Sequence, residues 1–404
     1  MTVMATTSIL FIMATTLMTI VAYQQQATAV RVGRVRAMHV ADAGINAYLY
    51  QLRNDYTYYL TQPDTGWQVV SGIEKYRVKA VAPTATTPLT LYSMGVAGDG
   101  TQTIAATVRL RTFADYLFLS DLDLTIEAQA DITGQMRSNG DVDNKSTKVH
   151  GKIIAGESFT GKAPDQGFAE NQPKASFSAI ADWMQKRMRP AAVTAGTLFP
   201  ASGALGYRVA VHLNDVVVER VTGVSDKGVF TTESVRSLVI PPSGILYFED
   251  TVWVAGDFAS PLTIVAHKGA SLGDIYLIGD FKPSTTAPTA PTATGGLVAE
   301  ANIIVPSWMG TTDLSVNAAL MARTGDIYDD IKQGFTDHRI DIQGSFTFGN
   351  GTLAGGNGEP VVGLRQKYYT YDQRLDLYPP PLYPQIADES LKVDTWVEDK
   401  APIW

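Results

Sequence analysis

The chain has 404 residues, no cysteine, 18% charged residues and a formal net charge of −8. At about 150 residues per domain, this length is enough for two or three domains. The absence of cysteine excludes disulfides, thiol nucleophiles and cysteine-ligated metal ions. The negative net charge provides no general attraction for nucleic acid, so we expect no nucleic-acid partner.

The first 23 residues carry no charge, with Arg31 as the first basic residue and Asp42 as the first acidic one. A secretory signal peptide needs a basic start and a core of about 7–15 apolar residues, and this run has neither feature. A membrane anchor fits the length, because about 20 apolar residues cross the hydrocarbon layer. However, the arginines that follow the run would then place the rest of the chain in the cytoplasm. A third interpretation removes that conflict: Met1 is a processed end, left after a basic leader was cut off.

The helical pattern continues beyond the apolar run. No proline occurs between Tyr23 and Tyr56. Apolar residues recur on one helical face. The sequence therefore predicts one helix over residues 1–56, about 80 Å long at 1.5 Å per residue. The residues expected to pack this helix on a following domain are Val35, Met38, Ile45, Leu49 and Leu52.

The uncharged start and the segment AMHVADAGINAYLYQLRND at 37–55 resemble type IV pilins, in particular pilin-like proteins with a PilX-type N-terminus. The segment ADYLFLSD…ITGQMRSNGDV at 114–142 is similar to the domain that often follows such N-termini. The resemblance implies a processed, methylated Met1 and insertion into the cytoplasmic membrane before assembly. It also implies a leader peptidase and inner-membrane assembly machinery as partners, and an extracellular filament made of copies of the chain.

In such a filament the apolar helix halves form the core. The residues expected to pack there are Val3, Ile9, Leu10, Ile12, Leu17 and Ile20. The chain departs from the family at Ala5, where pilins usually carry a glutamate. This departure is commoner in minor subunits, so a low-abundance minor pilin or pseudopilin at a filament tip is the nearest alternative. A single-pass, membrane-anchored surface adhesin is the alternative from another class.

The region after the helix is predicted to be rich in β-structure. Residues 57–112 alternate apolar and polar residues at period two and predict a compact pilin-like β head. Within 113–360, Gly-Asp-Phe occurs at 256–258 and again at 279–281, and Gly-Asp-Ile-Tyr occurs at 273–276 and 325–328. Short strands repeated at this spacing are typical of a parallel β-helix, or solenoid. An irregular β-sandwich is the alternative. The predicted fold class is thus α+β.

One helix is expected within the β-rich region, over 176–188 and ended by Pro190. The last segment, 361–404, is rich in tyrosine and proline and predicts an extended tail. We expect this tail to lie against its own β domain or against a neighbouring subunit. Its acidic end, with Glu398 and Asp399, is a candidate partner for the basic helix centre of a neighbour, formed by Arg31, Arg34 and Arg36.

Candidate glycosylation sites are the two Asn-x-Ser/Thr sequons and a Pro/Thr/Ala loop. They comprise Asn144, Asn350, Thr285 and Thr286.

No pattern predicts chemistry. The five histidines are scattered and match no metal-binding spacing. The glycine-rich stretch at 349–358 lacks the Lys-Ser/Thr end of a phosphate-binding loop, and the DVDN stretch at 141–144 lacks the closing glutamate of a calcium loop. We therefore expect no catalytic, cofactor or metal site, and a structural protein instead of an enzyme.

Overall fold

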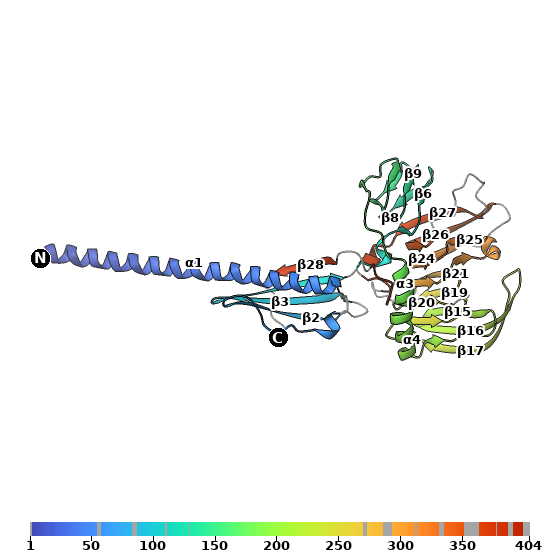
Figure 1. Cartoon of the computed structure of the whole chain (residues 1–404), viewed down its shortest axis with the longest axis horizontal. Coiled ribbons are helices and arrows are strands. Elements are labelled where there is room, and N and C mark those ends of the chain that lie inside the picture. The colour runs from blue at the N-terminus through green and yellow to red at the C-terminus, as the bar shows by residue number, and fades with distance from the viewer. Residues whose placement is uncertain are drawn as a thin grey trace. The chain divides into compact units, whose positions relative to one another are not determined.

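The structure is a computed structural model of the chain, and it forms two compact units (Figure 1). The helix–sheet unit comprises residues 1–109 and 390–404, and the stacked-strand unit comprises residues 110–389. The structure describes residues 2–54, 58–82, 87–109, 111–128, 130–269, 273–285, 293–311, 313–330, 335–350, 363–376, 378–386 and 391–398.

The helix–sheet unit begins with one continuous helix, α1 (Thr2–Asn54), of 53 residues (Figure 1). No proline interrupts this stretch, and a glycine costs only about 1 kcal/mol in a helix interior, so Gly33 and Gly44 do not end it. A single turn, α2 (Tyr58–Thr61), follows. The predicted helix over 1–56 therefore agrees with the observed one in extent.

An antiparallel sheet of five strands completes this unit, in the order β1-β2-β3-β4-β28. Its strands are β1 (Gln68–Ser71), β2 (Glu74–Val81), β3 (Leu89–Ala97), β4 (Gly100–Arg109) and β28 (Lys392–Glu398). Every second residue of β3 is buried, which is the pattern of a strand with one covered face. The last strand comes from the far end of the sequence, and Thr395 on β28 pairs with Thr107 on β4.

The second half of α1 covers this sheet. Ile45, Leu49 and Leu52 are buried, as expected for the packed face, and Met38 is half-buried. The expectation for Val35 is wrong, because this side chain is 50% exposed. At 100° per residue, Val35 lies about 80° around the helix from Ile45, so it points away from the sheet.

The stacked-strand unit contains most of the strands. Its first strands are β5 (Phe118–Ser120), β6 (Leu124–Ile126), β7 (Asp131–Thr133), β8 (Met136–Ser138), β9 (Val142–Asn144), β10 (Lys148–His150), β11 (Ile153–Ala155), β12 (Phe159–Gly161), β13 (Phe168–Ala169) and β14 (Leu198–Phe199). An antiparallel meander follows, with β15 (Gly206–Leu213), β16 (Asp215–Val224) and β17 (Phe230–Val239).

The remaining strands are β18 (Ile245–Phe248), β19 (Val252–Phe258), β20 (Leu262–Ala266), β21 (Ile275–Pro283), β22 (Gly295–Ala299), β23 (Ile303–Val305), β24 (Leu314–Ala322), β25 (Ile327–Asp329), β26 (Phe335–Phe348) and β27 (Gly363–Tyr371). Short 3-10 helices lie at Phe113–Asp115, Ser307–Thr311 and Gln373–Asp376.

From β18 to β26, each strand pairs with the strand two places along the chain and not with the next one. Thus β18 pairs with β20, β20 with β22 and β22 with β24, while β19 pairs with β21 and β21 with β23. Apart from the β15–β16–β17 meander, every strand pairing among the described residues of this unit is parallel. The strands therefore form stacked layers. A repeated sequence unit is expected to stack in this way, because one layer cannot bury its apolar residues alone.

The stack does not follow chain order throughout. Strand β26 pairs with β24 and also with β5, where Phe346 lies opposite Phe118. The next strand, β27, pairs with β7 (Tyr369 opposite Ile132). The layers of residues 118–169 therefore continue the stack of residues 245–348, although they precede it in the sequence.

The repeated sequence motifs mark equivalent positions in this stack. Ile275 pairs with Ile303, which pairs with Ile327, so the two Gly-Asp-Ile-Tyr motifs lie two layers apart. The residues that immediately precede these three isoleucines form a polar ladder. Asn302 Nδ2 donates to the Asp274 carboxylate at 3.0 Å, and Asn302 Oδ1 accepts from the Asp326 backbone N–H at 3.0 Å. The Gly-Asp-Phe motifs are not in register with each other, because a bulge after Val254 shifts the pairing.

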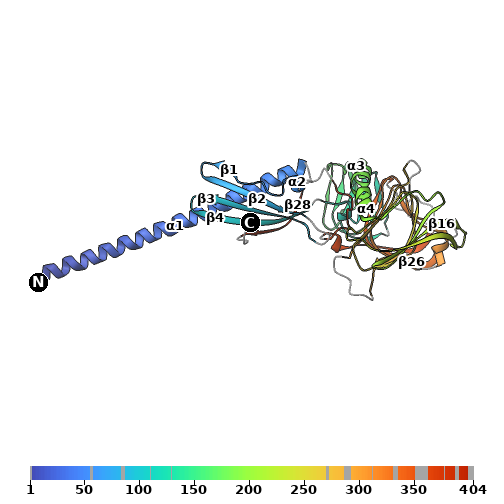
Figure 2. The same ribbon diagram turned by 90° about the horizontal axis from the view of Figure 1, so that it is seen from below.

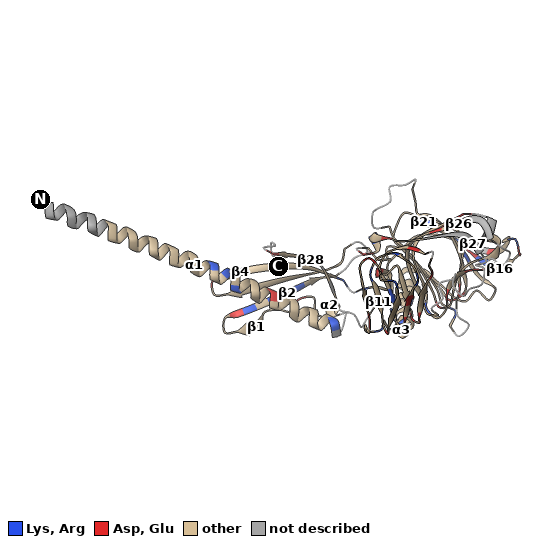
Figure 3. Ribbon diagram, turned by 90° about the horizontal axis from the view of Figure 1, so that it is seen from above, with Lys and Arg blue, Asp and Glu red and all other residues tan. Residues whose placement is uncertain are grey.

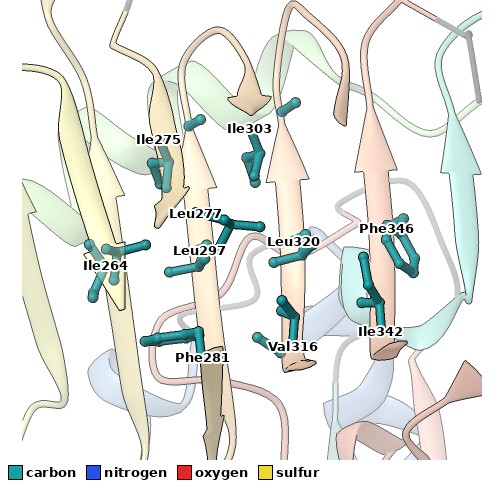
Figure 4. Packing of buried hydrophobic residues seen from close by; sticks show 14 of the residues in the cluster. Ile264, Ile275, Leu277, Phe281, Leu297, Ile303, Val316, Leu320, Ile342 and Phe346 are labelled. Atoms are coloured by element: carbon teal, nitrogen blue, oxygen red, sulfur yellow. The ribbon is translucent and has the colours of Figure 1, made fainter. Parts of the chain in front are cut away.

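The interior of the stack is filled by aliphatic and aromatic side chains from successive strands (Figure 4). Leu277, Leu297 and Leu320 are fully buried there and lie on three different strands. A second cluster covers the opposite face of several of these strands, with Tyr247 and Val298 packed against residues of a helical segment. Strands such as β18 and β22 are therefore buried on both faces.

That helical segment comprises α3 (Ser178–Trp183), a π-helix (Met184–Met188) and α4 (Arg189–Ala195), and it lies beside the strands (Figure 2). The expected end at Pro190 is wrong. The π-turn, in which the Arg189 N–H bonds to the Met184 carbonyl, comes immediately before this proline, and Pro190 stands in the first turn of α4, where it is tolerated. The segment ends at Gly196, whose φ of 69° is left-handed.

The expected division into four parts, 1–56, 57–112, 113–360 and 361–404, differs from the two observed units. The first two parts form one unit because the amphipathic half of α1 is buried on the sheet. The expected tail is divided: its first strand, β27, joins the stack, and Tyr383 and Ile386 are buried against it. Its last strand, β28, joins the other unit, where it pairs with β4.

Candidate assembly surface

Among the residues whose burial the structure describes, all side chains from 13 to 32 of α1 are exposed. Leu17 is 67% exposed and Ile20 is 50% exposed, whereas Ala37 and Ala41 in the second half are fully buried. The exposed apolar residues of this stretch are Met13, Leu17, Met18, Ile20, Val21, Tyr23, Val30 and Val32. We call residues 13–32 the apolar stem. A soluble monomer rarely exposes so large a continuous apolar surface, so this stretch indicates an interaction site.

The apolar stem carries no charge before Arg31, and in Figure 3 the described part of the helix shows no Lys, Arg, Asp or Glu colour up to its middle. Its threonines bond to the helix backbone: the Thr19 hydroxyl donates to the Thr15 carbonyl and the Thr28 hydroxyl to the Gln24 carbonyl, both at 2.8 Å. Such bonds satisfy the hydroxyl groups inside the helix. They therefore allow the stem to lie in water-free surroundings.

The second half of α1 approaches the sheet unusually closely. A Cβ added to Gly44 would lie 2.4 Å from the Ser93 hydroxyl, and one added to Gly100 would lie 2.3 Å from the carbonyl carbon of Gly33. Real side chains never adopt such distances, so these positions require glycine. The close contact fixes which face of the helix meets the sheet.

The residues expected in a filament core fall in two groups. Leu17 and Ile20 lie on the exposed stem. Met1 and the side chains of Val3, Ile9, Leu10 and Ile12 lie outside the described residues. Among the residues that the structure describes, no helix combines the length and hydropathy needed to cross a membrane.

The expected charge pairing joins neighbouring subunits, so it stays a prediction. Arg31, Arg34 and Arg36 are exposed, and none of them has an ion-pair partner in the described part of the structure. Glu398 is exposed on β28, and Asp399 lies outside the described residues. The three arginines are therefore available to a partner.

The candidate glycosylation sites differ in accessibility. The expectation for Asn144 is wrong, because its side chain is fully buried and bonds to the Lys162 carbonyl at 2.6 Å and the Ser146 N–H at 3.0 Å. This asparagine is part of the stack and no glycan can reach it. Asn350 is exposed but donates to Asp326 at 3.2 Å, and Thr285 is exposed. Thr286 lies outside the described residues.

Sequence reasoning missed a buried ionic cluster at the ends of three neighbouring strands. Glu300 is 4% exposed, its carboxylate contacts the Arg323 guanidinium, and His267 Nδ1 lies 3.1 Å from its other oxygen. Burial disfavours the charged form of Glu300, but the electrostatic interactions of the carboxylate with His267 and Arg323 outweigh this and lower the pKa of the carboxyl group. The spacing of these three residues along the sequence does not predict the cluster. Which residues lie side by side in a stack depends on how many residues each layer contains.

Among the described residues, no group of three or more metal-ligating side chains is placed to hold a metal ion.

Comparison with solved structures finds a distant similarity to a pilin. No protein-family model matches the chain, and no curated protein matches it. The crystal structure of the competence-associated pilin ComZ from Thermus thermophilus matches with a TM-score of 0.36 and 13% sequence identity, over 91% of this chain and 98% of that one. This similarity is too low to establish a shared fold.

Proposed function

We propose that the protein is a structural subunit of a type IV pilus-like extracellular filament, in which copies of α1 cover one another's apolar stems. One observation carries this proposal: a single helix is buried on its own sheet over its second half, carries no charge before Arg31, and is exposed over the described residues 13–32. A helix that only anchored the chain would not need this continuous second half.

The energetics agree with such an assembly. Full burial of one large apolar side chain contributes about 1.5–3 kcal/mol. Association of two proteins costs about 4–15 kcal/mol in lost translational and rotational freedom. Burying several side chains of the stem, such as Leu17, Met18 and Ile20, against neighbours on more than one side is therefore enough to offset that cost.

The further parts of the proposal follow from the resemblance of the N-terminal segment to pilins. Before assembly, the N-terminal run lies in the cytoplasmic membrane, where a leader peptidase cuts before Met1 and the new end is methylated. Inner-membrane machinery then transfers subunits into the filament. The β-rich regions form its outer surface, and we propose that the stacked-strand unit is a parallel β-helix, supported by its parallel pairing pattern.

A minor or tip subunit of the same filament is the second candidate, and the absence of a carboxylate at Ala5 favours it. Mass spectrometry of the native N-terminus, combined with quantification of the chain in sheared surface filaments, tests both candidates. A methylated Met1 in an abundant filament band supports a major subunit, and the same end in a scarce band supports a minor one. An unmodified initiator Met1 found only in membranes would contradict both and favour the anchored adhesin.

A further inference from the structure

A polar cavity lies on the surface of the stacked-strand unit, on strands β21, β24, β26 and β27. Its volume is about 840 Å³, within the range of about 300–1,000 Å³ of small-molecule sites. It is lined by Lys282, Pro283, Ser284, Thr285, Ser315, Val316, Asn317, Asp341, Ile342, Gln343, Thr370 and Arg374. Nothing in the proposed filament role requires this cavity.

The strand register explains why the cavity is polar. Phe281, Val316 and Ile342 are buried in the interior of the stack (Figure 4). The next residue on each strand must point to the opposite face, because side chains alternate along a strand. Asn317 pairs with Gln343, and Gln343 pairs with Thr370. These three residues therefore form a row across neighbouring strands, about 4.8 Å apart.

The cationic groups of the cavity already have partners. Lys282 Nζ lies 2.5 Å from Asp280, and Arg374 contacts Asp372 at 2.6 Å. Arg374 also donates to Asn317 Oδ1 at 3.0 Å. Among the described residues that line the cavity, an anionic ligand would thus find no unpaired cation. The electrostatics favour a neutral ligand.

The row of polar side chains retains hydrogen-bonding capacity. Gln343 accepts from Asn317 Nδ2 at 3.2 Å, but its own Nε2 group has no partner in the described part of the chain. The hydroxyl of Thr370 likewise has no partner among the described residues, and both side chains are exposed. Amide and hydroxyl groups both donate and accept hydrogen bonds, as sugar hydroxyls do.

We propose that this cavity is a binding site for a neutral glycan that lies across the strands, with Gln343 and Thr370 bonding its hydroxyl groups. The regular spacing of the row suits a ligand that repeats the same hydroxyl pattern, as an oligosaccharide does. The proposal does not depend on filament assembly, since every residue involved belongs to the stacked-strand unit of one chain.

Isothermal titration calorimetry of the full chain tests the proposal, in a zwitterionic detergent whose head group contains no sugar. The probes are maltohexaose, cellohexaose, laminarihexaose and the hexamer of N-acetylglucosamine. We expect at least one of them to bind. Hexagalacturonate and a single-stranded oligodeoxynucleotide serve as anionic probes and should not bind to this cavity.

The double variant Gln343→Ala/Thr370→Ala should bind the same oligosaccharide about tenfold more weakly, because it loses two hydrogen bonds. The matched control Gln166→Ala/Thr125→Ala changes the same residue types at exposed sites outside the cavity and should bind normally. Gln343→Glu retains the side-chain size but removes the Nε2 donor. It therefore tests the hydrogen bond from Gln343 to the glycan if the double variant does not fold.

Three results would overturn the proposal. One is failure of all four neutral probes to bind at millimolar concentration. Another is unchanged affinity in both Gln343 variants, which would place the site elsewhere. The third is binding of the anionic probes alone.

Discussion

The carbonyl oxygen of Ala37 on α1 lies above Gly95 on β3, at a point only 2.1 Å from where a Cβ at residue 95 would be. The same Cβ would lie 2.4 Å from the backbone nitrogen of Ala41. At this point helix and sheet thus meet backbone to backbone, with no side chain between them. This contact holds the second half of α1 on its sheet and leaves the first half to project beyond it.

Replacement of Gly95 by alanine should therefore separate α1 from the sheet. Both close atoms belong to the backbone and cannot move aside, so we expect a loss of about 1–3 kcal/mol in stability of this unit. Hydrogen exchange of residues 37–52 should become faster than in the wild-type chain. Gly223→Ala is the control, because its Cβ would meet nothing nearer than 3.5 Å. Equal exchange in the two variants would show that the close approach does not stabilise the unit.

A charge on the apolar stem should block assembly. In Leu17→Lys the ammonium group would have to enter a water-free helix bundle, which costs several kcal/mol without a partner. The amount of the chain in sheared filaments should fall at least about tenfold, which corresponds to 1.4 kcal/mol. Val235→Lys places the same charge on an exposed valine of β17 and should leave filament yield unchanged. Normal yield from the Leu17 variant would contradict the bundle of stems.

Stability of the stacked-strand unit should depend on pH through Glu300. Because the pKa of this carboxyl group is lowered below its ordinary 4.5 in the folded state, its contribution is present above that pH. The contribution is lost as the pH falls through the lowered value. Glu300→Gln leaves Arg323 without its partner and should cost about 3 kcal/mol at pH 7.

Urea unfolding followed by tryptophan fluorescence, measured from pH 7 to pH 3, checks this dependence. The difference between wild type and Glu300→Gln should shrink below pH 4.5. The control Glu157→Gln removes an exposed partner of Lys174 and should change stability by less than about 1 kcal/mol at every pH. A difference that stays constant with pH would mean that the folded-state pKa of Glu300 is not lowered.

Truncation of the chain after residue 390 should loosen the edge of the five-stranded sheet. It removes β28, and β4 then loses its partner on one side. We expect faster hydrogen exchange over residues 104–109, whose backbone groups pair with β28. Exchange over β20 and β22 in the other unit should not change. Unaltered protection of β4 would show that the last strand does not contribute to the sheet.

Several features follow from the sequence by itself, because they depend on neighbours along the chain. The absence of proline and charge between Met1 and Tyr23, followed by a 3.6-residue periodicity, is enough to predict one long helix with two different halves. The repeated Gly-Asp-Ile-Tyr motif marks strands at equivalent positions of the stack, because β21 and β25 both begin at its isoleucine.

Features that join residues far apart in the chain depend on how the chain packs in three dimensions. Val35 fits the apolar periodicity, but the glycines opposite Ala37 and Gly33 select a helix face that excludes it. Asn144 fits a glycosylation sequon, but its layer lies within the stack and buries it. The tail divides between two units because β4 and β26 each leave an unpaired edge. The sequence alone does not reveal such an edge, since strand pairing depends on which backbones meet in space.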